Sequence, residues 1–356
     1  MITVRLAALL PLAGVLVCVP GCSGSDARPS SRDTLASSRT DGGPRGSASG
    51  FRSPGAPPSL PSHGRLYGFW GLNGFVNPSG LGYVHQTFGL TVFQMASDNP
   101  TWAVGTLLPM VKAAGVRITL RMTPDHGAYT THGDFDLGAW KAHVADWEGS
   151  GVQLFIDDGT LVGHMLLDDI ANFAGQNPTA AELDEMARYS NELLPGLMTY
   201  VREKATAMPV PSDGRYRYVD AIVNQYTAAD GDVEVYAAAQ AARAAALDLG
   251  VINGLNIADG GDGSSGQPGW RPGRHAMSAA EITTYGAVLA TVPTCGMFLN
   301  WEYDGEERWA DGSVGSAWFD RPPLRTALAT LADLVASQPY VRLRRRDVRT
   351  TAPVAP

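Results

Sequence analysis

From residue 66 onward, short apolar runs alternate with longer segments in which apolar residues recur at helical spacing. Short apolar runs bounded by turn residues are typical of buried strands, and the longer segments are typical of amphipathic helices. This alternation predicts βα units and a parallel sheet. The expected strands lie at 66–71, 90–96, 116–122, 163–172, 205–210, 218–226, 251–258 and 296–301.

Eight such units in about 275 residues predict a single-domain α/β protein, a (β/α)₈ TIM barrel, which typically needs about 250 residues. Helix starts support this division into units, because Asn77-Pro78 and Asn99-Pro100 combine a capping residue with proline at the first helical position. Thr179–Glu182 and Ser278–Glu281 have the form of capping boxes, and the helix that begins with the first of them is expected to run through Leu197. A doubly wound open sheet is the alternative fold. No G-x-G-x-x-G pattern follows the first expected strand, which disfavours a dinucleotide-binding version of it.

The N-terminal segment differs from the rest in composition. Arg5 precedes an apolar run at 6–19 that is short for a membrane span. The run ends at Val19-Pro20-Gly21-Cys22, which resembles the lipobox of bacterial lipoproteins, with Cys22 as the lipidated residue. Cys18 lacks a small residue before it, and a plain secretory signal is the alternative. We therefore expect a signal peptide at 1–21 and an anchored, extracytoplasmic or secreted protein of the bacterial cell envelope.

Residues 22–64 are rich in Ser, Gly, Pro and Arg and predict a disordered tether, followed by the barrel at 65–340 and a basic, flexible tail at 341–356. Cys295 would be the only cysteine left after processing and anchoring, so no intramolecular disulfide is expected. The net charge of −8 argues against nucleic acid as a partner. Nothing in the sequence indicates an oligomer, so we expect a monomer.

Candidate chemistry gathers where the expected strands end. Active sites of such barrels lie at the carboxyl ends of the strands. The carboxylates there are Asp168, Asp169, Asp259 and Glu302. The candidate ligand-binding residues are Trp70, Asn73, Gln94, Arg121, Asp125, His126, Asn172, Gln225, Tyr226, Asn256, Trp301 and Tyr303. Carboxylates, amides and aromatic rings suit sugar hydroxyls and sugar ring faces, and paired acids suit glycoside hydrolysis.

In these features the chain resembles the (β/α)₈ glycoside hydrolases. Leu166-Leu167-Asp168-Asp169 is similar to their Leu-Asp-Glu strand-four ending, with Asp169 in the Glu place, and Phe298–Glu302 is similar to their strand-eight ending. The resemblance implies that Asp169 is the proton donor and that Glu302 or Asp259 is the nucleophile or base. Asp168 and Asp169 are neighbours on a strand, so only one of them can face the barrel mouth. Asp168 has the alternative of pairing with Arg121.

The sequence therefore predicts a glycoside hydrolase that acts on an extracytoplasmic carbohydrate without a cofactor. A non-catalytic carbohydrate-binding lipoprotein on the same barrel is the alternative. A metal-dependent barrel hydrolase is a third hypothesis, but the His, Cys and Asp residues nowhere have the spacing that is typical of a transition-metal site. Asp259 also begins an Asp-Gly-Gly-Asp-Gly run, for which calcium binding or a plain flexible loop are the other interpretations.

Overall fold

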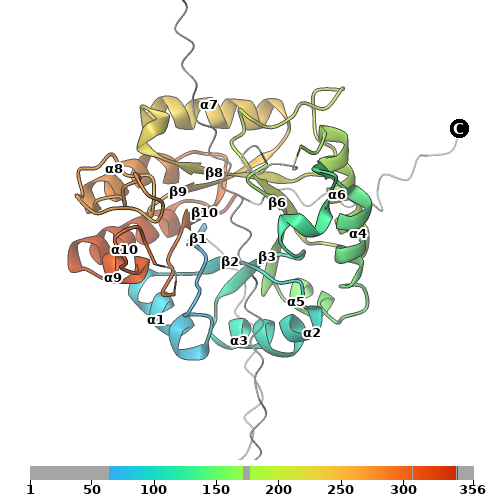
Figure 1. The fold of residues 1–356 in the computed structure, drawn as a ribbon, viewed down its shortest axis with the longest axis horizontal. Helices are drawn as coiled ribbons and strands as arrows, with labels where there is room; N and C mark the ends of the chain where they lie inside the picture. The colour runs from blue at the N-terminus through green and yellow to red at the C-terminus, as the bar shows by residue number, and fades with distance from the viewer. Residues whose placement is uncertain (1–63, 171–176, 307, 342, 344–356) are drawn as a thin grey trace, which may run out of the picture. The chain divides into compact units, whose positions relative to one another are not determined.

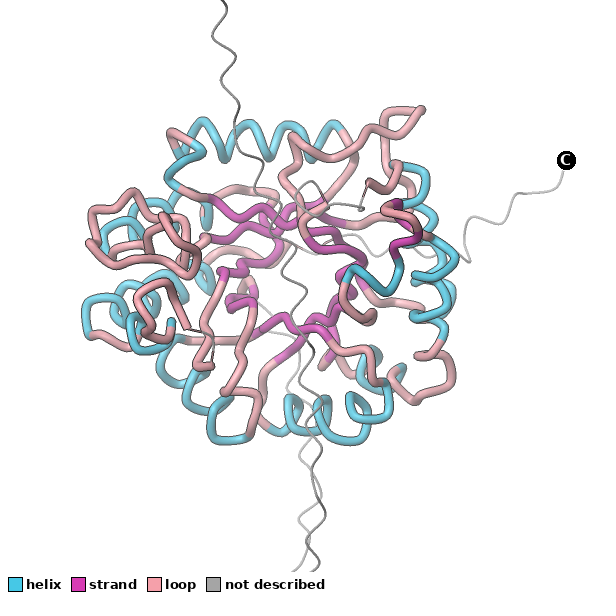
Figure 2. The backbone as a smooth tube through the Cα atoms, viewed as in Figure 1, coloured by secondary structure: helices cyan, strands magenta, loops and turns pink. Residues whose placement is uncertain are grey.

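The computed structural model describes residues 64–170, 177–306, 308–341 and 343. In this part of the chain, eight parallel strands form a closed barrel in the order β1-β10-β9-β8-β7-β6-β3-β2. The predicted (β/α)₈ barrel is confirmed. Figure 2 shows the strands as an inner ring with the helices around it. Cys22, Asn172 and the predicted tail from 344 onward lie outside the described residues.

The barrel strands are β1 (Leu66–Trp70), β2 (Val92–Ala96), β3 (Arg117–Arg121), β6 (Leu161–Asp168), β7 (Met198–Arg202), β8 (Ala221–Tyr226), β9 (Gly250–Leu255) and β10 (Cys295–Trp301). A small hairpin, β4 (Thr130–Thr131) with β5 (Asp134–Phe135), follows β3 outside the barrel. The barrel closes between β1 and β10, where Trp70 pairs with Trp301. Parallel pairing all round brings the carboxyl ends of the strands to one face of the barrel.

Helices connect the strands on the outside, as Figure 1 shows. They are α1 (Pro78–Phe88), α2 (Pro100–Trp102), α3 (Leu108–Ala113), α4 (Leu137–Ala145), α5 (Gln153–Asp157), α6 (Ala180–Leu193), α7 (Val233–Ala246), α8 (Ala279–Ala290), α9 (Gly315–Phe319) and α10 (Pro322–Ser337). A π-helical stretch, η1 (Ala103–Leu107), joins α2 to α3, and two short 3-10 turns are η2 (His126–Tyr129) and η3 (Ala228–Asp230). Within the described residues, no helix combines the length and apolar character that a membrane crossing needs.

Helix starts follow the predicted capping residues. The side chain of Asn77 accepts a hydrogen bond from Gly80 N–H, and that of Asn99 accepts one from Trp102 N–H. Thr179 with Glu182, and Ser278 with Glu281, form complete capping boxes at α6 and α8. Each cap satisfies backbone donors that the first helical turn leaves without partners.

The fifth strand does not lie where the sequence predicted it. The expected strand at 205–210 is a turn region, and β7 lies earlier, at Met198–Arg202. The prediction continued the preceding helix as far as Leu197, whereas α6 ends at Leu193, just before Pro195 and Gly196. This correction matters for function, because it brings Arg202 to the carboxyl end of a barrel strand.

Packing fills the barrel interior. Side chains that point inward, among them Leu66, Met165, Tyr200 and Leu299, form one buried cluster. Trp70, the last residue of β1, belongs to this cluster at the carboxyl end of the strand. Two further buried clusters lie between strands and helices, one toward α1, α8 and α10 and the other toward α4 and α6. The interior is therefore a packed core and not an open channel.

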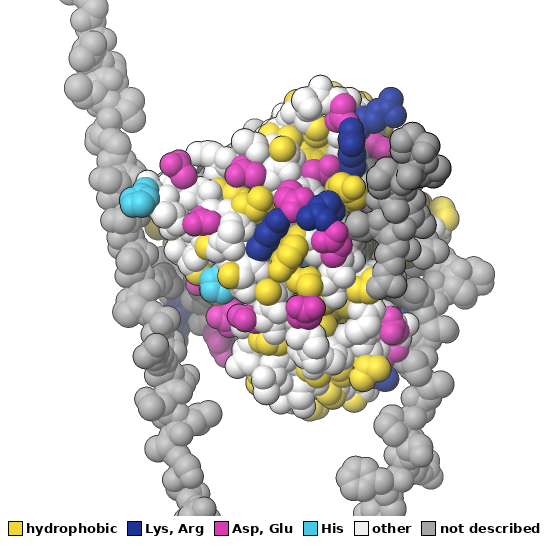
Figure 3. Space-filling model, turned by 90° about the vertical axis from the view of Figure 1, so that its right-hand side faces the viewer, with side chains coloured by type: hydrophobic (Ala, Val, Ile, Leu, Met, Phe, Trp, Pro, Cys, Tyr) yellow, Lys and Arg dark blue, Asp and Glu magenta, His cyan; other side chains and the backbone are white. Residues whose placement is uncertain are grey.

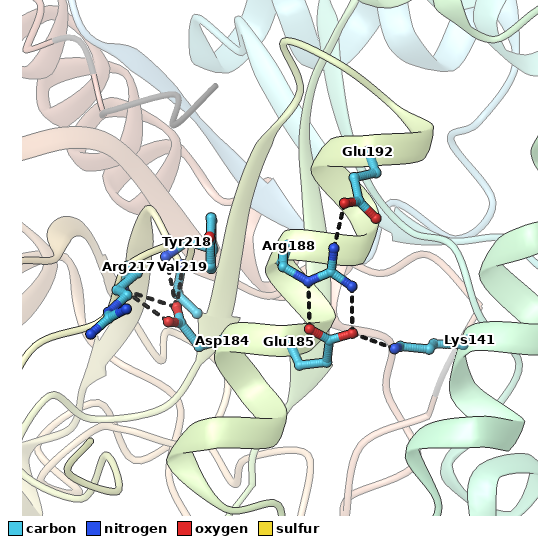
Figure 4. A network of polar contacts seen from close by, with 8 residues as sticks. All are labelled: Lys141, Asp184, Glu185, Arg188, Glu192, Arg217, Tyr218 and Val219. Carbon is cyan, nitrogen blue, oxygen red and sulfur yellow. Dashed lines mark hydrogen bonds and ion pairs between the residues drawn. The ribbon is translucent and has the colours of Figure 1, made fainter. Parts of the chain in front are cut away.

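The outer side of α4 and α6 carries a network of charged side chains. Figure 3 shows acidic and basic side chains side by side near the centre of this side of the molecule. In Figure 4, Glu185 lies between Lys141 of α4 and Arg188, which also reaches Glu192. Nearby, Asp184 accepts hydrogen bonds from the backbone N–H groups of residues 217, 218 and 219, which ties α6 to the segment before β8.

Candidate active site at the barrel mouth

A cavity of about 240 Å³ opens at the carboxyl ends of the strands. It is lined by Trp70, Gly71, Asn73, Gln94, Met95, Ala96, Arg121, Met165, Asp168 and Glu302. The lining comes from β1, β2, β3 and β6 and from the segments that follow β1 and β10. Two carboxylates, an arginine, two amides and an indole thus meet in a space about the size of one small ring. Six of the predicted site residues take part in this lining.

Asp168 and Glu302 come from opposite sides of the barrel. In the ring order, β9, β8 and β7 separate β10 from β6 on one side, and β1, β2 and β3 separate them on the other. Asp168 ends β6, and Glu302 directly follows β10. The two acids therefore line the same cavity from opposite walls.

An irregularity in β6 decides which of the two neighbouring aspartates lines the cavity. Met165 pairs with Tyr200 and Leu167 with Val201, so Leu166 is an extra residue against β7. Leu166 and Leu167 are both buried in the cluster under α4 and α6, whereas Met165 faces the interior. A bulge of this kind shifts the alternation of inward and outward side chains by one residue. Asp168 consequently lines the cavity, and Asp169 is not among the residues of its lining.

Glu302 lies close to the backbone of the first strand's end. The residue is 7% exposed, and its peptide bond to Trp301 is cis. Gly71 has a φ of +63°, and a Cβ atom built on it would lie 2.5 Å from Glu302 Oε2. Only glycine combines this backbone conformation with so close an approach. Residue 71 therefore helps to define where the Glu302 carboxylate lies.

Arg202, the last residue of β7, contacts both Asp168 and Asp169 at the end of β6, the fourth strand of the barrel along the chain. In the β6–β7 register it lies beside Asp168, whose Oδ1 accepts a short hydrogen bond from Arg202 Nε. Arg202 Nη2 lies 3.2 Å from Asp169 Oδ2. Asp168 thus pairs with Arg202, and the alternative of an ion pair with Arg121 is wrong. Sequence reasoning missed this arginine because the strand that carries it was placed too late.

The environment of the Arg202 guanidinium favours its charged form. Burial alone lowers its pKa, but the carboxylates of Asp168 and Asp169 more than reverse this, so the net pKa is raised. The third arm, Nη1, donates to Gln225 Oε1 at 3.0 Å. Gln225, predicted to bind ligand, thus contacts the arginine and is not part of the cavity lining.

Arg121 forms the wall next to Asp168. Its side chain is 10% exposed, and Nη2 lies 2.6 Å from Oδ1 of Asp125, whose side chain is 95% exposed. Among the described residues, Arg121 Nε has no hydrogen-bond partner. Arg121 thus keeps one buried N–H without a partner beside the cavity, while its contact with Asp125 is made by a different nitrogen.

His126 lies behind this wall. Its Nδ1 is 2.9 Å from the hydroxyl of Tyr129. Burial lowers the pKa of His126, the positive charge of Arg121 lowers it further, and Asp168 and Asp125 oppose the shift. The His126 imidazole is therefore mainly neutral at pH 7 and is not in the protonated form that could act as a general acid.

Two predicted ligand-binding tyrosines face away from the mouth. Tyr226 packs edge-to-face against Tyr236 of α7 and Tyr285 of α8, and its hydroxyl donates to Gly231 O. Burial raises its pKa to about 12. Tyr303 is fully buried and donates to Asp320 Oδ1 at 2.8 Å. Both belong to the outer core, because strand-end position alone does not show which face of the strand a side chain occupies.

Asp259 holds together the long loop after β9. Its Oδ2 lies 2.6 Å from Arg271 Nε, and its Oδ1 accepts the backbone N–H of Arg271. Asn256 Oδ1 accepts the N–H of Asp259 and so braces the start of the same loop. Neither residue lines the cavity. The structure thus gives the Asp259 carboxylate a structural partner outside the cavity.

This loop also supplies an aromatic residue that the sequence did not single out. Trp270 lies edge-to-face against Trp301, with ring centroids 5.2 Å apart. Both rings are partly exposed. Asn73, which follows the neighbouring strand β1, donates to Asp304 Oδ2 at 2.7 Å and lines the cavity. No group of three His, Cys, Asp or Glu side chains in the described part of the chain is arranged to hold a metal ion.

Comparisons with known proteins identify no family for this chain. No protein-family model matches it, and no curated protein matches it. Among solved structures, an endocellulase from Pyrococcus horikoshii in complex with cellotetraose is similar, with 10% identity, a TM-score of 0.48 and coverage of 76% of this chain and 92% of that one. The catalytic domain of the major endoglucanase from Xanthomonas campestris has 10% identity, a TM-score of 0.47 and coverage of 76% and 95%.

Gas2p from Saccharomyces cerevisiae, in complex with laminaritriose and laminaritetraose, has 11% identity, a TM-score of 0.47 and coverage of 82% of this chain and 68% of that one. At such identities and TM-scores, the similarity carries no information about activity. The chemistry of this protein must therefore be derived from its own side chains.

Proposed function

We propose that the barrel hydrolyses glycosidic bonds in the cavity between Asp168 and Glu302. The observation that carries this proposal is the pair itself, since two carboxylates from opposite walls line one cavity. One acid protonates the leaving oxygen as the C–O bond breaks. The other adds to the anomeric carbon or takes a proton from the water that adds there. Asp168 thus takes the place in the cavity that was expected for Asp169, because Leu166 is an extra residue in β6 and Asp168 belongs to the cavity lining.

The remaining lining suits a sugar ring. Trp70 offers an aromatic face, Gln94 and Asn73 offer amide groups, and Arg121 offers a buried donor. The cavity is small, so it accommodates one ring, and further units of a longer glycan would extend over the open mouth toward Trp301 and Trp270. No cofactor takes part in this chemistry.

We further propose that the protein acts outside the cytoplasm on a carbohydrate of its surroundings, held to a membrane through a lipid on Cys22. The support is the sequence Val19–Cys22 after an apolar run and the tether-like composition of residues 23–62. Mass spectrometry of the membrane fraction tests this. The full chain should carry a diacylglycerol-modified N-terminal cysteine, and Cys22→Ala should release it from membranes.

A glycan panel, screened for hydrolysis and binding with residues 64–356, tests the catalytic proposal. We expect release of reducing sugar from at least one glycan, with loss of release but not of binding in Asp168→Asn and in Glu302→Gln. Asp333→Asn, an exposed acid on α10, is the matched control and should behave as wild type. Hydrolysis that persists in both cavity variants would contradict the proposal.

A non-catalytic carbohydrate-binding protein is the second candidate. It is favoured by the engagement of both strand-four acids with Arg202, because carboxylates held in ion pairs can serve solely to shape a binding site. This candidate predicts binding of a glycan without hydrolysis by the wild type. The same panel therefore distinguishes the two.

A further inference from the structure

The cavity occupies only part of the barrel mouth. Its lining comes from β1, β2, β3 and β6 and from residues that follow β1 and β10. Among the described residues, none from β7, β8 or β9 lines it, although these strands also end at the mouth. The cavity is therefore closed off from the side of the mouth where β8 and β9 end.

Arg202 is the side chain that lies at this boundary. It ends β7 and follows Tyr200 by two residues, and Tyr200 packs in the barrel interior, so both side chains point inward. The Arg202 side chain is 16% exposed, and its Cζ is 5.0 Å from the centre of the Trp70 ring. A guanidinium at this distance from an indole makes a favourable cation–π contact.

The contact between Arg202 and Trp70 crosses the width of the barrel. In the closed order of strands, β1 and β7 have β10, β9 and β8 between them on one side and β2, β3 and β6 on the other. The two strands are therefore opposite each other, and a contact between their last residues spans the mouth. Trp70 belongs to the cavity lining and Arg202 does not, so the cavity ends at the indole with Arg202 outside it.

The guanidinium of Arg202 is fixed by partners on both neighbouring strands. Nε bonds Asp168, the last residue of β6, and Nη2 lies 3.2 Å from Oδ2 of Asp169, which follows it. On the other side, Nη1 donates to Oε1 of Gln225, in β8, at 3.0 Å. A planar guanidinium holds such partners in one geometry. The Trp70 ring therefore packs against a surface that is itself held in place.

We propose that Arg202 and Trp70 form a partition across the mouth, and that this partition determines which sugars the cavity accepts. Arg202 is the positioning residue, because it holds the Trp70 ring in place as a wall of the cavity. The space that remains is about 240 Å³, and it excludes a substituent on the edge of the bound ring that faces the indole. The preferred substrate is a glycan whose reacting ring is unsubstituted on that edge. This inference rests on the proposed glycosidase function.

Two substitutions, Arg202→Ala and Arg202→Met, separate the volume of this side chain from its charge. Both variants lose the contacts with Asp168, Asp169 and Gln225, so the effect of the lost charge is common to both. Only alanine vacates the space beside the indole, because methionine is long, flexible and packs well against an aromatic ring. A partition predicts that the two variants differ, whereas a role through charge alone predicts that they are alike.

The probes are the 4-nitrophenyl glycoside of the sugar that the glycan panel identifies and the mono-O-methyl ethers of that glycoside, one for each ring hydroxyl. The measurement is kcat/KM of each ether relative to the parent glycoside, so that a general loss of activity cancels. For at least one ether, this ratio should rise in Arg202→Ala by about tenfold or more over wild type and Arg202→Met, since one methyl group in a pocket is worth that much. Equal ratios in all three proteins would overturn the proposal.

Arg271→Ala is the matched control. Arg271 also pairs with an aspartate, Asp259, and its Cζ lies 5.6 Å from the centre of the Trp270 ring, but neither Arg271 nor Trp270 lines the cavity. Its ratios should equal those of wild type. If Arg202→Ala does not fold, Trp70→Phe makes the same partition thinner from its other side and should raise the ratio for at least one ether. Unchanged ratios in that variant would equally contradict the partition.

Crystal structures of Arg202→Ala and Arg202→Met separate the failure of this proposal from that of the proposed function. In Arg202→Ala the cavity should extend past the Trp70 ring toward Gln225 and exceed the wild-type volume of about 240 Å³, and in Arg202→Met it should not. If no glycan is hydrolysed but the cavity enlarges in this way, the glycosidase function fails and the partition stands. If glycans are hydrolysed while the cavity and the ratios are both unchanged, the partition fails alone.

Discussion

The backbone of Gly71 approaches the carboxylate of Glu302 so closely that a methyl group on residue 71 would lie 2.5 Å from Glu302 Oε2. Gly71 directly follows β1, and β1 pairs with β10, the strand that delivers Glu302. The position of one proposed catalytic acid is therefore tied to the absence of a side chain on the neighbouring strand end.

Gly71→Ala should consequently reduce hydrolysis far more than it reduces stability. The added Cβ displaces Glu302, and the left-handed backbone costs about 1–2 kcal/mol for a residue other than glycine. We expect a lower kcat with a modestly lower Tm, measured by glycan hydrolysis and thermal unfolding. Gly82→Ala is the control, because Gly82 lies within α1 and its Cβ would meet nothing within 4 Å. Unchanged kcat in Gly71→Ala would contradict the proposed role of Glu302.

Asp259→Asn should affect stability and not chemistry. The Asp259 carboxylate is buried and bonds both the side chain and the backbone of Arg271. The asparagine amide of the variant would lose the ion pair with the Arg271 side chain and weaken the hydrogen bond from the Arg271 backbone N–H. The loss of a buried charge-assisted hydrogen bond costs about 1–3 kcal/mol. We expect a lower Tm with unchanged kcat per folded molecule. A loss of kcat comparable to that of Asp168→Asn would return Asp259 to the list of catalytic candidates.

The barrel was predictable from the sequence because its evidence is local. Apolar runs, capping boxes and Asn-Pro helix starts each depend on a few neighbouring residues, and the structure confirms the caps at Asn77, Asn99, Thr179 and Ser278. The fifth strand was misplaced because the leucine-rich helical pattern was continued to Leu197, past the break that Pro195 and Gly196 signal ahead of Met198–Arg202.

The site was less predictable because it depends on register. The bulge at Leu166 reverses which aspartate faces the mouth, and nothing in a run of apolar residues indicates an extra residue opposite another strand. The same limit applies to Tyr226 and Tyr303, whose positions at strand ends were predicted correctly while the faces they occupy were not. Arg202 was missed for both reasons, since its strand and its register partner were unknown.

Glu185 should make the stability of the barrel depend on acidic pH. Its hydrogen bonds from Arg188 lower its pKa to about 2, with burial opposing and Lys141 adding to the effect. A lowered pKa in the folded state means that this stabilisation is present above the unfolded-state pKa, about 4.5, and is lost as the pH falls toward 2. Because the pair is partly exposed, we expect a contribution of about 1 kcal/mol.

Glu185→Gln should therefore lower Tm at pH 7, and the difference from wild type should shrink at pH 2.5. Thermal unfolding at the two pH values measures this. Glu192→Gln is the comparison, since Arg188 is the one ion-pair partner of Glu192 among the described residues and Glu192 is more exposed, so its effect at pH 7 should be smaller. An equal loss of Tm at both pH values would show that Glu185 acts through packing and not through its charge.

Hydrolysis of aryl glycosides with good and poor leaving groups tests the proposed cleavage between Asp168 and Glu302 most directly. A good leaving group departs without a proton, so the variant of the proton-donating acid, either Asp168→Asn or Glu302→Gln, should keep near wild-type rates on it and lose about 100-fold or more on a poor one. The variant of the other acid should lose activity on both. Wild-type rates in both variants, or equal sensitivity of both variants to the two leaving groups, would contradict this cavity as the catalytic site.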